Sequence, residues 1–89
     1  MTLPDKTPPD VSFDKKPKNK LDGSKAKYKF SSSEPGSTFE CKLDHKHFKH
    51  CTSPHKVKHL KPGKHRFKVK ATDAAGNTSA AAKDKFKVV

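Results

Sequence analysis

The sequence has 89 residues, of which only 29% are hydrophobic, and its formal net charge at pH 7 is +12. This length fits one compact domain and excludes two domains with separate cores. The positive charge comes from 20 lysines and a single arginine, set against nine carboxylates. Base-reading proteins usually depend on arginine, whose planar guanidinium bonds bases in a bidentate way, so this balance argues against sequence-specific DNA recognition. Delocalised, salt-dependent attraction to anionic partners fits it better.

The start of the chain has the composition of a linker. Residues 1–10, MTLPDKTPPD, are rich in proline and polar residues, and the Pro8-Pro9 pair keeps the chain extended. No apolar run reaches the length of a membrane span, and the first residues lack the apolar stretch of a signal peptide. We therefore interpret residues 1–10 as an interdomain linker and residues 11–89 as the domain, and we expect any signal peptide of a secreted parent to lie outside this sequence.

Alternation of apolar and polar residues predicts β-strands along the first half of the domain. A short strand at residues 11–13 is followed by a turn-rich loop. The segment KAKYKF, residues 25–30, places its apolar side chains on one face and three lysines on the other. After the loop SSSEPGS, the segment TFECKLD, residues 38–44, repeats this pattern. Both segments are predicted strands.

The second half of the chain continues with a hairpin and three further strands. The hairpin ends in FKHC, residues 48–51, where Phe48 and Cys51 have opposite parity, so a bulge or an irregular strand end is needed if both face inward. Apolar and polar residues alternate again in the segments 55–60, 64–73 and 83–89. In each of the last two segments, most lysines occupy every second position and so lie on one face of the predicted strand. Six to seven short strands without helical periodicity predict an all-β, antiparallel sandwich.

Cys41 and Cys51 lie on either side of the predicted hairpin turn. Two cysteines can pair in only one way and hairpin neighbours lie within disulfide reach, so we predict a bond between them. Closing this loop stabilises the fold by about 2 to 3 kcal/mol in the chain-entropy model. Such a bond implies an oxidising compartment outside the cytoplasm. The alternative is a pair of reduced thiols in a cytosolic protein.

The lysine-rich strand faces are the main candidate for binding. The strand at residues 64–73 should lie centrally in its sheet, flanked by the last strand and by the strand that carries Lys42, so this sheet should present the denser basic surface. We predict that it attracts polyanions through Lys42, Lys64, Arg66, Lys68, Lys70, Lys85 and Lys87. The alternative is that the lysines only solvate the surface and protect strand edges from aggregation.

Aromatic side chains among the basic residues would favour a dedicated binder of single-stranded nucleic acid, because bases stack on exposed rings. The alternation instead assigns five aromatic side chains to the core, namely Tyr28, Phe30, Phe39, Phe67 and Phe86. This pattern counts against such a binder.

Other polar groups give weaker signals. His45, His47 and His50 surround one hairpin and are possible ligands of zinc, copper or nickel, but a zinc site needs three or four convergent ligands. The stretch from Asp73 to Asn77 offers oxygen atoms to calcium, although turn formation by Asp73 and Gly76 is the simpler interpretation. We expect no metal and no cofactor.

Glu34 and Glu40 raise the possibility of acid–base catalysis or of an isopeptide bond between a lysine and an Asp or Asn. An isopeptide bond needs a buried lysine, whereas nearly every lysine here has outward parity. We expect neither enzymatic activity nor a small-molecule substrate.

Four segments, SSEPGSTFEC, FKHCTSP, PGKHRFKV and ATDAAGN, carry a resemblance over about residues 31–79. They resemble bacterial immunoglobulin-like repeats that occur in tandem in secreted and cell-surface proteins, especially of actinobacteria, and the TPPD of the linker is similar to the joints of such arrays. The resemblance implies an immunoglobulin-like or fibronectin type III-like sandwich of about seven strands, with a Cys41–Cys51 bond. It also implies a structural or adhesive module without catalytic residues.

Two departures from the family stand out. Positions that are mostly Ser, Thr or Gly in such repeats are Lys or His here, and His45-Lys46 replaces a Gly-Gly turn after Asp44. We therefore expect a monomeric, extracellular or cell-surface module that associates with polyanions and neighbouring repeats. The competing interpretation is an engineered, lysine-supercharged scaffold without a natural ligand.

Overall fold

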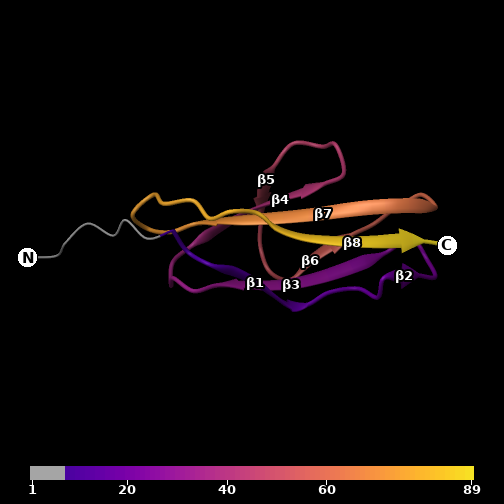
Figure 1. Ribbon diagram of the computed structural model, residues 1–89, viewed down its shortest axis with the longest axis horizontal. Coiled ribbons are helices and arrows are strands. Elements are labelled where there is room, and N and C mark those ends of the chain that lie inside the picture. The colour runs from indigo at the N-terminus through magenta and orange to yellow at the C-terminus, as the bar shows by residue number, and fades with distance from the viewer. Residues whose placement is uncertain (1–7) are drawn as a thin grey trace, which may run out of the picture.

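The alternating segments of the sequence form two packed β-sheets in the computed structural model, which describes residues 8–89 (Figure 1). Residues 1–7 of the expected linker lie outside the described residues. The eight strands are β1 Val11–Lys15, β2 Lys20–Leu21, β3 Ala26–Ser32, β4 Thr38–Leu43, β5 Lys49–Cys51, β6 His55–Val57, β7 Gly63–Thr72 and β8 Ala82–Val88. From residue 8 onward, no helix is long and apolar enough to cross a membrane.

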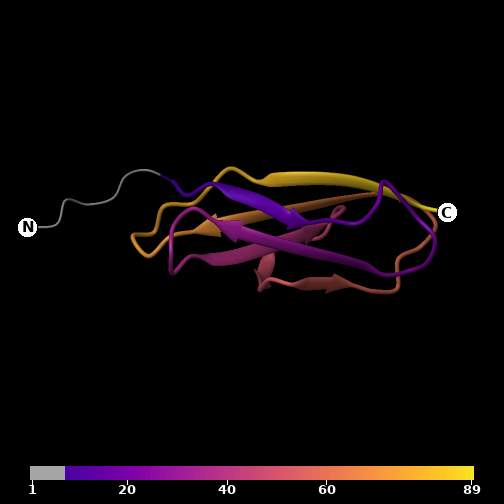
Figure 2. The ribbon, with the colours of Figure 1, turned by 90° about the horizontal axis from the view of Figure 1, so that it is seen from below.

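The strands are divided between a three-stranded sheet, in the order β1-β3-β6, and a five-stranded sheet, in the order β2-β8-β7-β4-β5. The pairs are antiparallel except that of β2 with β8. The two views show the sheets lying one over the other along the long axis (Figure 2). The chain is thus an immunoglobulin-like β-sandwich, as the sequence predicts, and β7 lies centrally between β8 and β4 as expected.

The core fills the space between the sheets. At its centre the rings of Tyr28 and Phe67 stack with centroids 3.9 Å apart, and both side chains are fully buried. Phe13 packs on both of these rings from β1. The other buried members are Ala26, Phe30, Cys41, Cys51, Val57, Leu60, Val69, Phe86 and Val88. The alternation therefore identifies the core correctly.

Two details of the strands differ from the expectation. The loop expected before residue 25 contains β2, which is held to β8 by hydrogen bonds from the Lys87 N–H to the Asn19 carbonyl, 2.7 Å, and from the Val89 N–H to the Leu21 carbonyl, 2.9 Å. A strand of two residues is too short to show a period. The first strand also runs on to Lys15, with a register shift after Phe13.

The predicted disulfide joins Cys41 of β4 to Cys51 of β5, with their Cα atoms 5.8 Å apart. The register pairs Cys51 with Phe39 and Cys41 with Lys49, so the bond runs diagonally across the hairpin. The hairpin turn departs from a Gly-Gly turn because Asp44 takes a positive φ of 54° and His45 does not.

The loop between β7 and β8 is organised by Asp73, as expected for a turn. Its carboxylate accepts hydrogen bonds from the backbone N–H groups of Ala75, 3.0 Å, and Asn77, 2.8 Å. Gly76 supplies a positive φ of 89°. Since Asp73 is buried and its carboxylate accepts backbone N–H groups, these contacts define a turn.

Candidate functional site

Cross-strand register arranges the outward side chains of the five-stranded sheet in rows. Paired residues of neighbouring strands point to the same face, with Cβ atoms roughly 5 Å apart. Three successive rows consist of cations alone: Lys20–Lys87–Lys64, Lys85–Arg66 and Lys83–Lys68–Lys42. We call these eight residues the basic face.

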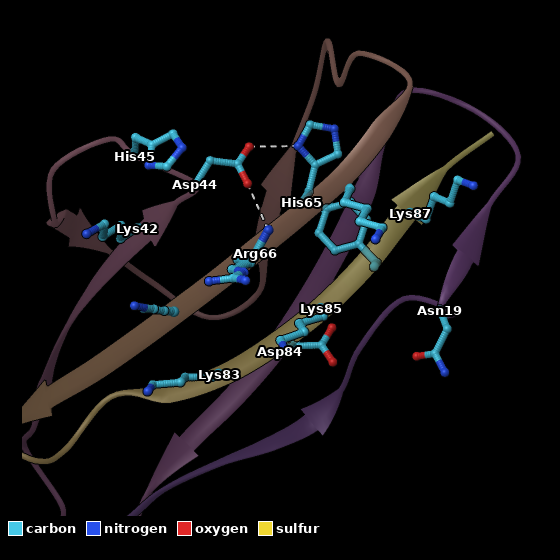
Figure 3. Close-up of a pocket in the computed structure, with 13 residues that line it drawn as sticks. Asn19, Lys42, Asp44, His45, His65, Arg66, Lys83, Asp84, Lys85 and Lys87 are labelled. Carbon is cyan, nitrogen blue, oxygen red and sulfur yellow. Dashed lines mark hydrogen bonds and ion pairs between the residues drawn. The ribbon is translucent and has the colours of Figure 1, made fainter.

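A groove of about 1210 Å³ follows the basic face (Figure 3). Six of the seven residues predicted to bind polyanions line it, namely Lys42, Lys64, Arg66, Lys68, Lys85 and Lys87, whereas Lys70 does not. Lys83 also lines the groove and was missing from the predicted set, although its parity is that of Lys85. The structure thus brings together on one surface nearly all the cations that the sequence singles out.

The side chains of the basic face form no ion pairs within the described residues. Within residues 8–89 the ion pairs are Lys16 with Asp84 and His65 with Asp44, and neither uses a residue of this face. Lys42 and Lys68 are half-buried, and the other six side chains are exposed. Directly opposed lysines repel each other by up to about 0.2 to 1 kcal/mol per pair, so an anion lying across the rows would relieve this repulsion.

The fourth row, which consists of Lys70, Glu40 and His50, marks the end of the surface made of cations alone. Glu40 of β4 lies between Lys70 of β7 and His50 of β5 in the register. Its carboxylate places a negative charge beside Lys70, so this row is not made of cations alone.

Asp44 lies at the rim of the groove, and its negative charge is compensated locally. Its carboxylate accepts hydrogen bonds from His65 Nδ1, 2.7 Å, and from the backbone N–H of Arg66, 2.8 Å (Figure 3). Burial tends to raise the pKa of Asp44, but the hydrogen bonds from His65 and Arg66 and the nearby imidazoles outweigh it, so the pKa is lowered. Asp44 therefore stays ionised as part of a bonded pair.

His65 completes this arrangement on the other side of its ring. Its Nε2 lies 2.7 Å from the carbonyl oxygen of Lys61, so both ring nitrogens face oxygen acceptors. The hydrogen bond to Lys61 and then that to Asp44 raise the pKa of His65. Because only an imidazolium can donate from both nitrogens, this geometry favours the charged form. The ring also stacks on Phe86, with centroids 5.4 Å apart.

Phe48 lies outside the core, on the same side of the sheet as the basic face. Its ring centroid is 4.3 Å from Lys70 Nζ and 5.6 Å from Lys42 Nζ. The parity conflict with Cys51 is resolved because β5 begins only at Lys49, leaving Phe48 free to point outward. The inward assignment holds for the five aromatic residues named from the sequence, but it does not extend to Phe48.

A buried carboxylate that the sequence reasoning missed lies under the groove. Asp84 Oδ2 accepts a hydrogen bond of 2.8 Å from the hydroxyl of Tyr28, and Asp84 Oδ1 lies 3.9 Å from Lys16 Nζ. Burial, followed by the hydrogen bond and charge of Asp84, raises the pKa of Tyr28. The signal was present, since Asp84 shares the parity of Phe86 and Val88.

The histidines considered as metal ligands are not gathered with other ligating side chains in the described residues. Within residues 8–89, no three or more His, Cys, Asp or Glu side chains are grouped so as to hold a metal ion. His55 packs on Phe67, with ring centroids 5.8 Å apart, and burial lowers its pKa. His59 is exposed.

No family model matches the chain, and no curated protein matches it as a relative.

Proposed function

We propose that this chain is a non-catalytic extracellular module, structural or adhesive in role, that associates with polyanions through its basic face. The observation that supports this proposal best is the three adjacent rows of cations, none of which is ion-paired within residues 8–89. A protein surface that only needs solubility is better served by both signs of charge interspersed.

The spacing of these charges suits a linear polymer. Neighbouring strands lie about 4.8 Å apart and alternate residues about 7 Å apart along a strand, so the rows form a flat lattice of positive charge. Nucleic acids, heparin-like polysaccharides and cell-wall polymers all repeat anionic groups along an extended chain. A lattice of lysines attracts them without reading a sequence, because lysine is a hydrated point charge.

Extracellular placement is supported by the disulfide between Cys41 and Cys51, since such bonds persist in oxidising compartments. The resemblance to tandem immunoglobulin-like repeats of bacterial surface proteins supports neighbouring repeats as further partners. We propose that the module acts as a monomer within such an array.

Heparin retention across a salt series tests the proposal. The basic-face variant carries Lys64→Gln, Lys68→Gln, Lys85→Gln and Lys87→Gln. The control, called the loop variant, carries Lys18→Gln, Lys46→Gln and Lys61→Gln in loops and Lys49→Gln at the start of the edge strand β5. Each variant lowers the net charge by the same amount. We expect the basic-face variant to lose about tenfold or more in affinity at low salt, with a shallower salt dependence, because it has lost four potential counterion-releasing contacts. The loop variant should lose about threefold or less.

Equal losses in the two variants would contradict a localised face. They would favour the second candidate, an engineered lysine-supercharged scaffold without a natural ligand. That candidate is supported by the regular placement of lysines at outward positions on both sheets.

A further inference from the structure

The three-stranded sheet carries a second set of outward lysines on the opposite side of the sandwich. Its cross-strand register pairs Lys27 with Lys56 and Lys15 with Lys29. A smaller groove, of about 350 Å³, is lined by Ala26 and Val57 together with four lysines, Lys25, Lys27, Lys56 and Lys58. We call Lys15, Lys25, Lys27, Lys29, Lys56 and Lys58 the second basic face.

This second basic face is also free of ion pairs within the described part of the chain. All six of its lysines are exposed. Asp14 is the carboxylate of β1, and it accepts a hydrogen bond from the hydroxyl of Ser31 at 3.2 Å. It lies near the Lys15–Lys29 pair, whereas Lys27 and Lys56 are paired on the other side of β3, beside the smaller groove. The lysines that line this groove therefore form an uncompensated cluster.

The two basic faces point in opposite directions because the inward side chains of both sheets make one shared core. Tyr28 of β3 stacks on Phe67 of β7, so the sheets are held together back to back. Packed sheets lie about 10 Å apart, and the lysine side chains extend beyond each of them. A polymer lying along one face therefore leaves the other face accessible to a second polymer.

We infer that the domain is bivalent and bridges two linear polyanions, with one chain on each face. The ligand chemistry is an extended polymer with repeating phosphate or sulfate groups. The inference rests on the proposed function, and it adds that a single domain crosslinks its ligand. Bridging of this kind gives an avidity that a domain with one basic face lacks. Once one polymer chain is held on the first face, the lysines of the second face are held close to neighbouring polymer chains, and this raises their effective concentration.

A capture assay tests the bridging. Heparin is immobilised, protein is bound at low salt, and soluble fluorescent heparin is then added. In parallel, the same steps are run with duplex DNA on both sides. The second-face variant carries Lys25→Gln, Lys27→Gln, Lys56→Gln and Lys58→Gln, and the loop variant of the same charge serves as the control. Circular dichroism and urea midpoints confirm that each variant is folded.

We expect the wild type and the loop variant to recruit the soluble polymer. The second-face variant should bind the immobilised polymer within about threefold of the wild type but recruit at least about tenfold less of the soluble polymer per bound protein. Both polymers should give this result, since lysine lattices recognise charge and not bases.

Recruitment by the second-face variant at the wild-type level would overturn the bivalent arrangement. The proposed function would still stand in that case if the basic-face variant lost binding to the immobilised polymer. Failure of the wild type to bind either immobilised polymer at low salt would overturn both.

Discussion

His65 donates a hydrogen bond of 2.7 Å to Asp44, and the opposite nitrogen of its ring lies 2.7 Å from the carbonyl oxygen of Lys61. The ring thus ties the β4–β5 turn to the β6–β7 turn at one end of the five-stranded sheet. Both contacts are donations from the ring only when the imidazole is protonated, so the link between the turns depends on pH.

The contribution of His65 to the stability of the fold should be smaller at pH 8.5 than at pH 5.5. Its pKa is raised in the folded state, so its stabilising contribution is complete below the unfolded value of about 6.5 and is lost as the pH rises through the folded value. Urea midpoints of the wild type and of His65→Gln should converge as the pH rises. A constant difference between them across this range would contradict the prediction.

Asp44 has the opposite dependence. Its pKa is lowered in the folded state, so its contribution is present above the unfolded value of about 3.9 and is lost as the pH falls through the folded value. Asp44→Asn should therefore destabilise the protein at pH 5.5, and this difference should shrink below pH 3. Urea unfolding at the two pH values measures it, and Asp22→Asn, in the exposed loop after β2, serves as the control.

Replacement of Tyr28 by phenylalanine should destabilise the fold by about 1 to 3 kcal/mol, because it leaves the buried Asp84 carboxylate without the hydroxyl donor. In the variant with both Tyr28→Phe and Asp84→Ala, the total loss should be smaller than the sum of the single losses, since the two side chains interact. Urea unfolding of the four proteins measures this coupling, and simple additivity would contradict it.

The same contact predicts a spectroscopic result. Tyr28 is the one tyrosine of the chain, and its pKa is raised by burial and by Asp84. The absorbance of phenolate should therefore stay low as the pH is raised beyond 10 and appear together with unfolding. Titration of the phenolate near pH 10 while circular dichroism still reports folded protein would rule this out.

Loss of the disulfide should cost about 2 to 3 kcal/mol, because Cys41 and Cys51 close a loop with a sequence separation of 10. The variant with both cysteines changed to serine should unfold at lower urea concentration than the oxidised wild type. Reductant should lower the midpoint of the wild type toward that of the variant and leave the variant unchanged. An unchanged wild type in reductant, with free thiols verified by mass, is the outcome that contradicts the prediction.

Two phenylalanines should respond very differently to truncation. Phe67→Ala should cost about 3 to 5 kcal/mol, because this ring is fully buried and packs on both Tyr28 and Phe13. Phe48→Ala should cost about 1 kcal/mol or less, because its ring lies outside the core and its lysine contacts are weak. Urea unfolding compares the two, and similar losses would contradict the outward placement of Phe48.

The sequence predicts the sandwich because side-chain alternation is a local property of each strand. Tyr28, Phe67 and Phe86 are recognised as core residues from their own segments, and the lysines between them are assigned to the surface by the same rule. The central position of β7 and the clustering of Lys42, Lys68 and Lys85 follow once the strand order of such a sandwich is assumed.

Other features depend on contacts between segments far apart in the chain. The pairing of Tyr28 with Asp84 spans 56 residues, and that of Asp44 with His65 spans 21. Parity places Asp84 inward but does not say which donor will meet it. The alternation does not predict β2, because two residues cannot display a period. Phe48 lies in the turn before β5, where side chains do not alternate as they do in a strand.

The parallel contact between β2 and β8 also determines how the domain responds to pulling. The start of the coloured ribbon and the C-terminus, marked C, lie toward opposite ends of the long axis (Figure 1). Tension between them draws β2 and β8 past each other along their length. The bonds from Lys87 to Asn19 and from Val89 to Leu21 are then loaded together, in shear, and must break at the same time. We therefore expect the short strand β2 to help the domain resist extension.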